Sequence, residues 1–414
     1  MEQVVAITML FAIWEGPPRP TMSDLNFTMA VVQMGIKSWR RMGEDSSHMI
    51  SMHWLVTISL ASLLLLGCIE PQSDSVPEPY PFLTEFSTDT LLAHDLQGEL
   101  FVHSDSLGNP KRIAVGELFV FVGDSQAEQA ITVFDRRSGE FIGYTGNKGE
   151  GPREISSVWS LDFKPGKDSG WIYNYPGVLK FLDGASMTEE SIRLTGGGTP
   201  MSPVWIAGDS IASSGGYESG RLGIYTPDGE FVRTIGPDPP GEISTPMIAR
   251  QRVYEAVLKT NSEGTSIVVA SKNTDRIEFF DSSKMLRLVR GPGFHEPVFS
   301  TTIDNQGNTR MQIERETIQG YVSVAVTDQF VFALYSGRSR GWIRSQRYFS
   351  PPAKTVVVFD WSGYPVGVLG LKDGAMAIGV SNDGRFLYAI YRRPLPIVLR
   401  YEVPALYHTV NNNS

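Results

Sequence analysis

From residue 85 onward, the chain alternates short apolar runs with turn residues. The runs are roughly four to eight residues long, and Gly, Pro, Asn and Asp separate them. Long stretches with the 3.6-residue period of an amphipathic helix are nearly absent from this part of the chain. Short apolar runs between turn residues are typical of strands joined by tight turns. The pattern therefore predicts an all-β fold.

One local pattern recurs along this region: an aromatic residue, a short turn with Gly or Asp, and an apolar continuation. The copies begin at Phe134, Phe181, Tyr225, Phe280 and Phe359, with a weaker sixth copy at Tyr401. Self-similarity at roughly 40–50 residues is typical of a β-propeller, in which each copy is one blade. The sequence therefore predicts six four-stranded antiparallel blades. The strand before each aromatic residue would be the third of its blade, and the strand after it the fourth.

The spacing of the copies also predicts an insertion and a way to close the ring. Phe280 and Phe359 are 79 residues apart, which exceeds one blade, so we expect an insertion near residues 292–319. A ring needs a strand from the other end of the chain, and residues 86–103 can supply it. Closure of this kind leaves only short, protected strand edges. We expect the propeller to occupy residues 85–410.

The net charge and the cysteine count disfavour some classes of function. The formal charge is −9 and the pI is near 5.3, which disfavours a nucleic-acid binder, because such proteins need a basic face to displace counterions. Cys68 is the sole cysteine, so the chain has no intramolecular disulfide and no cysteine-based zinc site. We expect a monomer that does not bind nucleic acid.

The region around Cys68 predicts export and a lipid anchor. Residues 54–66 form an apolar run that is too short to span a bilayer comfortably but has the length of a signal-peptide core. It ends in Leu65-Leu66-Gly67-Cys68, which looks like the lipobox of bacterial lipoproteins, where the cysteine receives the lipid. We assign residues 1–67 to a signal peptide with an over-extended N-terminus. Residues 68–84 would be a lipidated, proline-rich tether.

The expected links between blades share a motif. Gly149-Glu150-Gly151-Pro152-Arg153-Glu154-Ile155 returns in outline at residues 239–243 and more faintly at residues 291–294. It resembles the link of the six-bladed β-propeller lipoproteins of bacterial envelopes, which are relatives of the NHL-repeat and TolB-like propellers. The resemblance implies the fold and a lipid-anchored place in the cell envelope, at the outer membrane or in the periplasm. It implies no specific activity.

Two sequence motifs near residue 340 are candidates for a catalytic or binding role. Gly337-Arg338-Ser339-Arg340-Gly341 fits the G-x-S-x-G nucleophile elbow, but too little chain follows for a hydrolase domain, so we interpret it as a loop. The same segment carries four arginines within ten residues: Arg338, Arg340, Arg344 and Arg347. Guanidinium groups bind carboxylates and phosphates bidentately. The arginines would form either an anion-binding patch or a solvated hairpin.

No catalytic constellation emerges, and histidines are sparse. We therefore expect a binding or scaffold module rather than an enzyme, with an unidentified protein or glycan ligand at one rim and the mouth of the central channel. One alternative is a metal-dependent hydrolase of the propeller lactonase type, which would hold a divalent cation such as Ca²⁺ in the channel. A second alternative is a receptor for acidic glycans that uses the four arginines.

Overall fold

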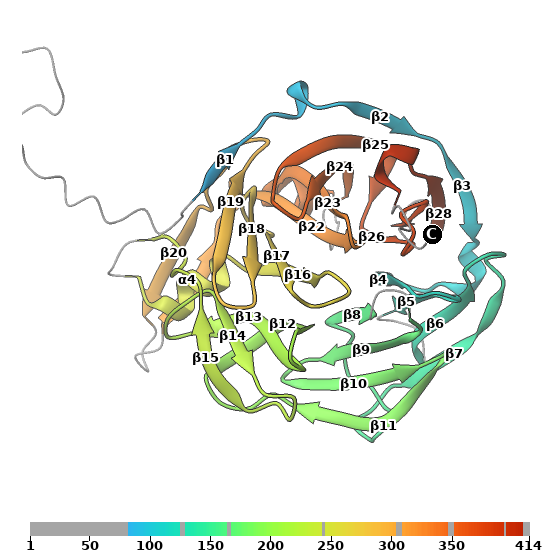
Figure 1. The fold of residues 1–414 in the computed structure, drawn as a ribbon, viewed down its shortest axis with the longest axis horizontal. Helices are drawn as coiled ribbons and strands as arrows, with labels where there is room; N and C mark the ends of the chain where they lie inside the picture. Colours follow the sequence, from blue (N-terminus) through green and yellow to red (C-terminus); the bar gives the residue numbers. More distant parts are fainter. Residues whose placement is uncertain are drawn as a thin grey trace, which may run out of the picture. The chain divides into compact units, whose positions relative to one another are not determined.

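The computed structural model describes residues 82–124, 129–163, 167–241, 245–303, 309–346, 352–392 and 395–408. They belong to the second of two compact units, residues 77–414; the first unit, residues 1–76, lies outside the described residues. The described residues form six blades in a ring, which confirms the predicted six-bladed β-propeller (Figure 1). No helix in this part of the chain is long and apolar enough to cross a bilayer.

The first three blades are consecutive in the sequence, and each has four antiparallel strands. Blade 1 contains β4 (Pro110–Val115), β5 (Phe119–Asp124), β6 (Gln129–Asp135) and β7 (Phe141–Asn147). Blade 2 contains β8 (Ser160–Phe163), β9 (Ser169–Asn174), β10 (Val178–Asp183) and β11 (Ser186–Arg193). Blade 3 contains β12 (Gly198–Ile206), β13 (Ser210–Tyr217), β14 (Leu222–Tyr225) and β15 (Phe231–Ile235).

The last three blades combine C-terminal strands with strands from the start of the propeller. Blade 4 contains β16 (Ala256–Thr260), β17 (Ser266–Ser271), β18 (Arg276–Asp281) and β19 (Met285–Arg290). Blade 5 contains β22 (Ile318–Val326), β23 (Phe330–Ser339), β24 (Ala353–Asp360) and β25 (Pro365–Ala375). Blade 6 contains β26 (Ala377–Val380), β27 (Phe386–Tyr391), β28 (Ile397–Glu402) and β3 (Gly98–Val102).

The N-terminal part of the propeller runs along the outer edge of blades 4, 5 and 6 (Figure 1). Strand β3 pairs antiparallel with β28 and closes the ring, as the sequence predicts. Two further strands were not anticipated: β1 (Leu83–Glu85) adds to β19 and β2 (Ala93–Leu96) adds to β25, both in parallel. They give blades 4 and 5 a fifth strand each. The sheet thus begins two residues before the boundary drawn from the sequence.

The six recurring aromatic residues all lie in third strands, as predicted. Phe359 in β24 is fully buried and meets the ring of Phe86 edge-on, with 5.6 Å between the centroids. Full burial of such a side chain stabilises the fold by about 1.5–3 kcal/mol. The Asp after the aromatic residue sets the turn: the Asp281 carboxylate accepts from the amides of Ser283 (2.7 Å) and Lys284 (2.9 Å). The repeat therefore combines a core residue with a turn residue.

The link between blades 1 and 2 shows why the glycine-rich motif recurs. Gly149 has a φ of +155°, and a Cβ there would stand 2.0 Å from the Glu154 carboxylate. That carboxylate accepts from the Gly151 amide at 2.8 Å and holds the corner. Ile155 is then fully buried between the blades. The motif turns the chain and anchors the next blade.

The predicted insertion is present as a separate two-stranded sheet of β20 (Phe299–Ile303) and β21 (Thr309–Ile313). Two short helices also leave the blade pattern. Helix α4 (Met247–Val253) precedes β16, and α5 (Arg340–Ser345) follows β23. Together with the insertion, they belong to the connections of blades 3, 4 and 5.

Candidate functional site

The innermost strands of the six blades surround the propeller axis: β4, β8, β12, β16, β22 and β26 (Figure 1). Residues of these six strands line a cavity of about 200 Å³. Its wall is mixed: Ile113, Leu258 and Val322 are apolar, whereas Ser202 and Gln319 are polar. This is the central channel, which we expected to contribute to binding. The cavity alone is large enough for a few atoms of a ligand, so the geometry of its two ends decides its use.

An ion pair crosses the channel. Lys259 of β16 contacts Asp162 of β8, with 2.6 Å between Nζ and Oδ1. Both residues line the 200 Å³ cavity and also a smaller cavity of about 50 Å³ beyond it, near the ends of the innermost strands. The pair therefore stands between the two cavities. The other end of the 200 Å³ cavity lies at the start of the innermost strands.

The mouth at that end continues into a cavity of about 490 Å³. The two cavities share Lys111, Arg112, Trp159 and Lys272. The larger one is lined by the cations Lys111, Arg112, Lys148 and Lys272 and by the acids Asp124 and Glu255. We call the residues that line this 490 Å³ cavity the channel mouth.

Arg112 on β4 is a cation of the channel mouth that no carboxylate of the described residues contacts. Its Nε donates to the Trp159 carbonyl at 2.7 Å, and its Nη1 donates to the Lys111 carbonyl at 3.0 Å. Within the described residues it forms no ion pair with a carboxylate. Removal from water lowers the pKa of the guanidinium below its ordinary value, and the more distant Glu255 offsets part of this effect.

Glu255 lies among several cations just before β16. Its carboxylate is hydrogen-bonded to the Lys272 ammonium. Burial opposes ionisation of Glu255, but Lys272, Arg112 and Arg340 outweigh burial, so the pKa of the carboxyl lies below its usual value. Glu255 is therefore ionised at neutral pH and already engaged by Lys272.

An aromatic wall borders the same opening. The ring of Trp159 stacks on Tyr175, with 4.9 Å between the centroids and 27° between the planes. The Asn174 side chain orders the segment before Trp159, because its Oδ1 accepts from the amides of Ser156 (3.1 Å) and Ser157 (2.8 Å). The channel mouth thus combines cations with a fixed apolar face.

Three of the four arginines predicted from the sequence, Arg338, Arg340 and Arg344, lie within the described residues. Arg338 is exposed and packs over the Trp342 ring at 4.9 Å, and Arg344 is exposed on α5. Arg340 turns toward the channel mouth: its Nη1 donates to the Asn273 amide oxygen at 3.4 Å, and its charge acts on Glu255. Arg347 and the lipidation candidate Cys68 lie outside the described residues.

The G-x-S-x-G match is not a nucleophile elbow. Ser339 ends β23 and is the N-cap of α5, where its hydroxyl accepts from the Trp342 amide at 3.2 Å. The expected loop is therefore a strand followed by a helix of six residues. The side chain of Ser339 is used to cap that helix.

The lactonase-type alternative would require a cation site in the channel. Among the described residues, no group of three or more His, Cys, Asp or Glu side chains is placed to hold a metal ion. The acidic group inside the channel, Asp162, is paired with Lys259. The described channel thus presents an ion pair where that alternative would need several carboxylates.

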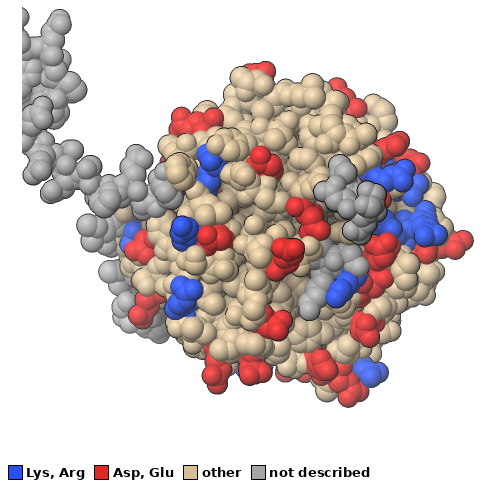
Figure 2. Space-filling model, in the orientation of Figure 1, with Lys and Arg blue, Asp and Glu red and all other residues tan. Residues whose placement is uncertain are grey.

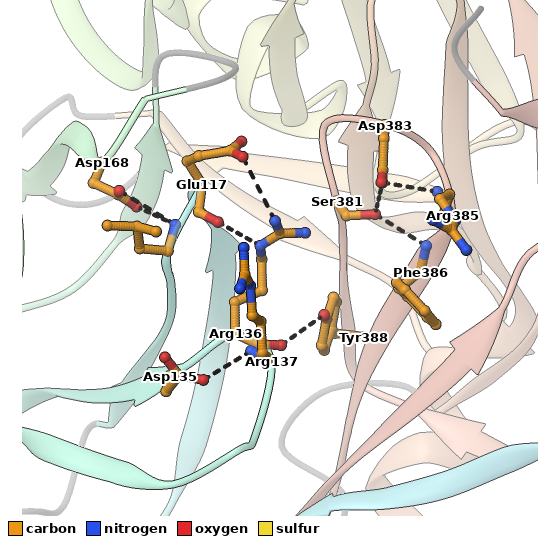
Figure 3. A network of polar contacts seen from close by, with 11 residues as sticks. Glu117, Asp135, Arg136, Arg137, Asp168, Ser381, Asp383, Arg385, Phe386 and Tyr388 are labelled. Atoms are coloured by element: carbon orange, nitrogen blue, oxygen red, sulfur yellow. Dashed lines mark hydrogen bonds and ion pairs between the residues drawn. The ribbon is translucent and has the colours of Figure 1, made fainter.

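At the opposite end of the blades, a network of polar contacts connects blade 6 to blade 1 where the ring closes (Figure 3). The Tyr388 hydroxyl of blade 6 donates to the Arg136 carbonyl of blade 1 at 3.3 Å, and the Arg136 Nε donates to the Glu117 carbonyl at 2.6 Å. The Asp168 carboxylate of blade 2 accepts from the Leu118 amide at 3.0 Å. This network joins three blades at the seam where the two ends of the propeller meet.

Surface charge is mixed on the face shown in Figure 2. Acidic residues are scattered over the whole face, including its upper and lower rims, and basic residues lie mainly toward its left and right sides. No large field of one sign covers this face, so it offers no obvious electrostatic footprint for a polyanion.

Sequence reasoning missed Arg112, Glu255 and Lys272. They belong to no motif and stand beside strand ends, where charged residues are common. The one local signal was the Lys111-Arg112 pair at the start of an apolar run. Their grouping depends on the ring that brings blades 1 and 4 to the same axis.

Comparison with known proteins agrees with the architecture. The family described as TolB-like 6-blade propeller-like matches residues 107–383. No curated protein matches the chain. Among solved structures, a putative exported protein (BF0058) from Bacteroides fragilis NCTC 9343 is similar at 12% identity and a TM-score of 0.47, over 77% of this chain and 98% of that one. With more than half of its length matched, the chain belongs to the TolB-like 6-blade propeller-like family.

Proposed function

We propose that this protein is an exported, lipid-anchored binding module of the bacterial cell envelope that takes its ligand at the channel mouth. One observation carries the binding site: the cavity on the propeller axis adjoins the 490 Å³ cavity, and the two share Lys111, Arg112, Trp159 and Lys272. Concave sites with an apolar wall and a few convergent polar groups are the usual form of small-ligand sites.

The envelope location is supported by the apolar run at residues 54–66 and by Cys68 at its end. Replacing Cys68 by Ser should abolish incorporation of radiolabelled palmitate and move the protein from the membrane fraction to the soluble fraction. Retention of the label or of membrane association by the Ser variant would contradict the anchor.

The binding role can be tested by filling the site. Ser157 lines the large cavity, and Ser157→Tyr would occupy it without removing a charged group. Thermal unfolding is followed with a panel of sugars, sugar acids, amino acids and short peptides, because a ligand that binds only the folded state raises Tm. We expect at least one panel member to raise Tm saturably for the wild type and to lose this effect in Ser157→Tyr.

The matched control is Ser186→Tyr, at the exposed start of β11 near the other end of blade 2. It should respond to the panel as the wild type does. The proposal fails if no panel member stabilises the wild type, or if stabilisation persists in Ser157→Tyr.

A further inference from the structure

Arg112 retains donors that the described protein groups do not use. A guanidinium has five N–H donors, and the hydrogen bonds to the Trp159 and Lys111 carbonyls use two of them. Both bonds fix the orientation of the side chain without supplying negative charge. Arg112 is partly buried, and a partly desolvated cation without a carboxylate partner would be stabilised by an anion in the adjoining cavity.

The two acids of the channel mouth are already occupied. The Asp124 carboxylate accepts from the amides of Gly108 (2.7 Å) and Asn109 (2.8 Å), and Glu255 is held by Lys272. Arg340 adds a further cation near Glu255, and its Nε is buried with no hydrogen-bond partner among the described residues. An opening with an excess of cations is notable in a chain whose formal charge is −9.

The amount of uncompensated charge indicates what kind of anion fits. At the Arg112 end of the channel mouth, Arg112 is a cation without a contacting carboxylate among the described residues, and the nearby Glu255 carboxylate would repel an anion of two charges more strongly than an anion of one. A carboxylate carries one charge and matches the planar donor edge of a guanidinium, whereas a phosphomonoester approaches two charges at neutral pH. The balance favours a monocarboxylate.

The rest of the ligand would lie against the apolar side of the channel mouth. Trp159 lines both cavities, and the partly exposed Val158 lines the larger one. A ring-shaped body can rest on such a face while its carboxylate reaches Arg112. The 490 Å³ volume falls within the range of small-ligand pockets.

We infer that the channel mouth binds a small monocarboxylate with a cyclic body, the carboxylate pairing with Arg112 and the ring lying along Trp159. This inference rests on the proposed function and gives the chemical class of its ligand. It places the anion site at Arg112, which lines the channel mouth, and not at the exposed arginines Arg338 and Arg344, which do not line it.

Isothermal titration calorimetry with glucuronate and with benzoate tests the inference, with glucose and benzyl alcohol as their neutral counterparts. We expect saturable binding of at least one carboxylate, no binding of its counterpart, and weaker binding as salt is raised. Inorganic phosphate should not compete. Arg112→Met should weaken carboxylate binding at least tenfold, whereas Arg338→Met, a matched exposed arginine, should leave it unchanged.

Circular dichroism and Tm establish whether Arg112→Met folds. If it folds and binds the carboxylate with wild-type affinity, the inference is wrong. If Arg112→Met does not fold, Ser157→Tyr provides the test instead. Carboxylate binding that survives filling of the cavity by Tyr would show that the carboxylate binds elsewhere, and the inference would be wrong. A neutral panel ligand that requires the open cavity, without any carboxylate binding, would refute the inference and leave the proposed function standing. Absence of any ligand at the channel mouth would refute both.

Discussion

Lys259 and Asp162 meet across the propeller axis, although blade 3 separates their blades around the ring. Their side chains are 15% and 17% exposed, so water screens the 2.6 Å contact only in part. The same carboxylate oxygen also accepts from the Phe163 amide at 3.0 Å. The pair stands between two cavities of the channel and connects the walls that blades 2 and 4 contribute.

Replacing Lys259 by Met should destabilise the protein, because Asp162 would stay in the channel without its cation. A hydrogen bond to a charged group contributes about 1.5–3 kcal/mol, and we expect a loss of free energy of unfolding in the lower half of that range. Urea unfolding of Lys259→Met, Asp162→Asn and the double variant measures the coupling between them. Strictly additive losses would show that the contact contributes nothing.

A second ion pair is more deeply buried. Arg221 and Glu278 are 1% and 3% exposed, with 2.6 Å between Nε and Oε2, and they connect blade 3 to blade 4. Arg221→Met should cost about 3–5 kcal/mol because it strands a buried carboxylate. The double variant Arg221→Met, Glu278→Leu should recover much of that loss, since an apolar pair of similar volume carries no desolvation penalty.

Chemical denaturation of Arg221→Met and of the double variant checks this prediction. Arg153→Met is the control, because Arg153 and Glu189 form an ion pair in which both side chains are about two-thirds exposed. It should not change stability measurably. A double variant less stable than Arg221→Met would contradict the argument.

Arg287 should hold the N-terminal strand β1 against the blades. Its Nη1 donates to the Thr84 hydroxyl (2.6 Å), its Nε to the Ser362 carbonyl (2.7 Å) and its Nη2 to the Tyr364 hydroxyl (2.9 Å). We expect Arg287→Ala to lower stability by about 1–2 kcal/mol. It should also speed limited proteolysis near β1.

Amide hydrogen exchange locates the effect of Arg287→Ala. Protection should fall in β1 and at the paired positions of β19, while the strands of blade 2 keep theirs. Uniform loss of protection around the ring would mean that Arg287 acts on global stability instead.

Glu255 should make stability depend on acid pH. Its pKa in the folded protein lies below the ordinary value of 4.5, so its contribution is complete above about that pH and is lost as the pH falls through the folded-state pKa. The difference in free energy of unfolding between wild type and Glu255→Gln should therefore be largest near neutrality and shrink in acid. Denaturant titrations over that range test this, and a constant difference would contradict it.

Much of the architecture could be read from the sequence because its causes are local. A third-strand aromatic residue such as Phe359 and a turn residue such as Asp281 act on their immediate neighbours, so each blade repeats the same short pattern. The number of blades, the insertion and the closing strand β3 follow from that repeat. The parallel strands β1 and β2 could not be read in this way, because single short strands at an outer edge leave no period in the sequence.

The sequence by itself determined a six-bladed ring and a candidate lipid anchor. Strand periodicity, turn-forming residues and an apolar run each depend on residues that are adjacent in the chain, so they can be recognised without the tertiary structure. Only the tertiary structure decided the site. Arg112 and Glu255 are more than a hundred residues apart and become neighbours because ring closure brings the innermost strands to one axis. Local rules cannot signal such a contact, because the electrostatic interaction between these groups exists only after the blades have assembled.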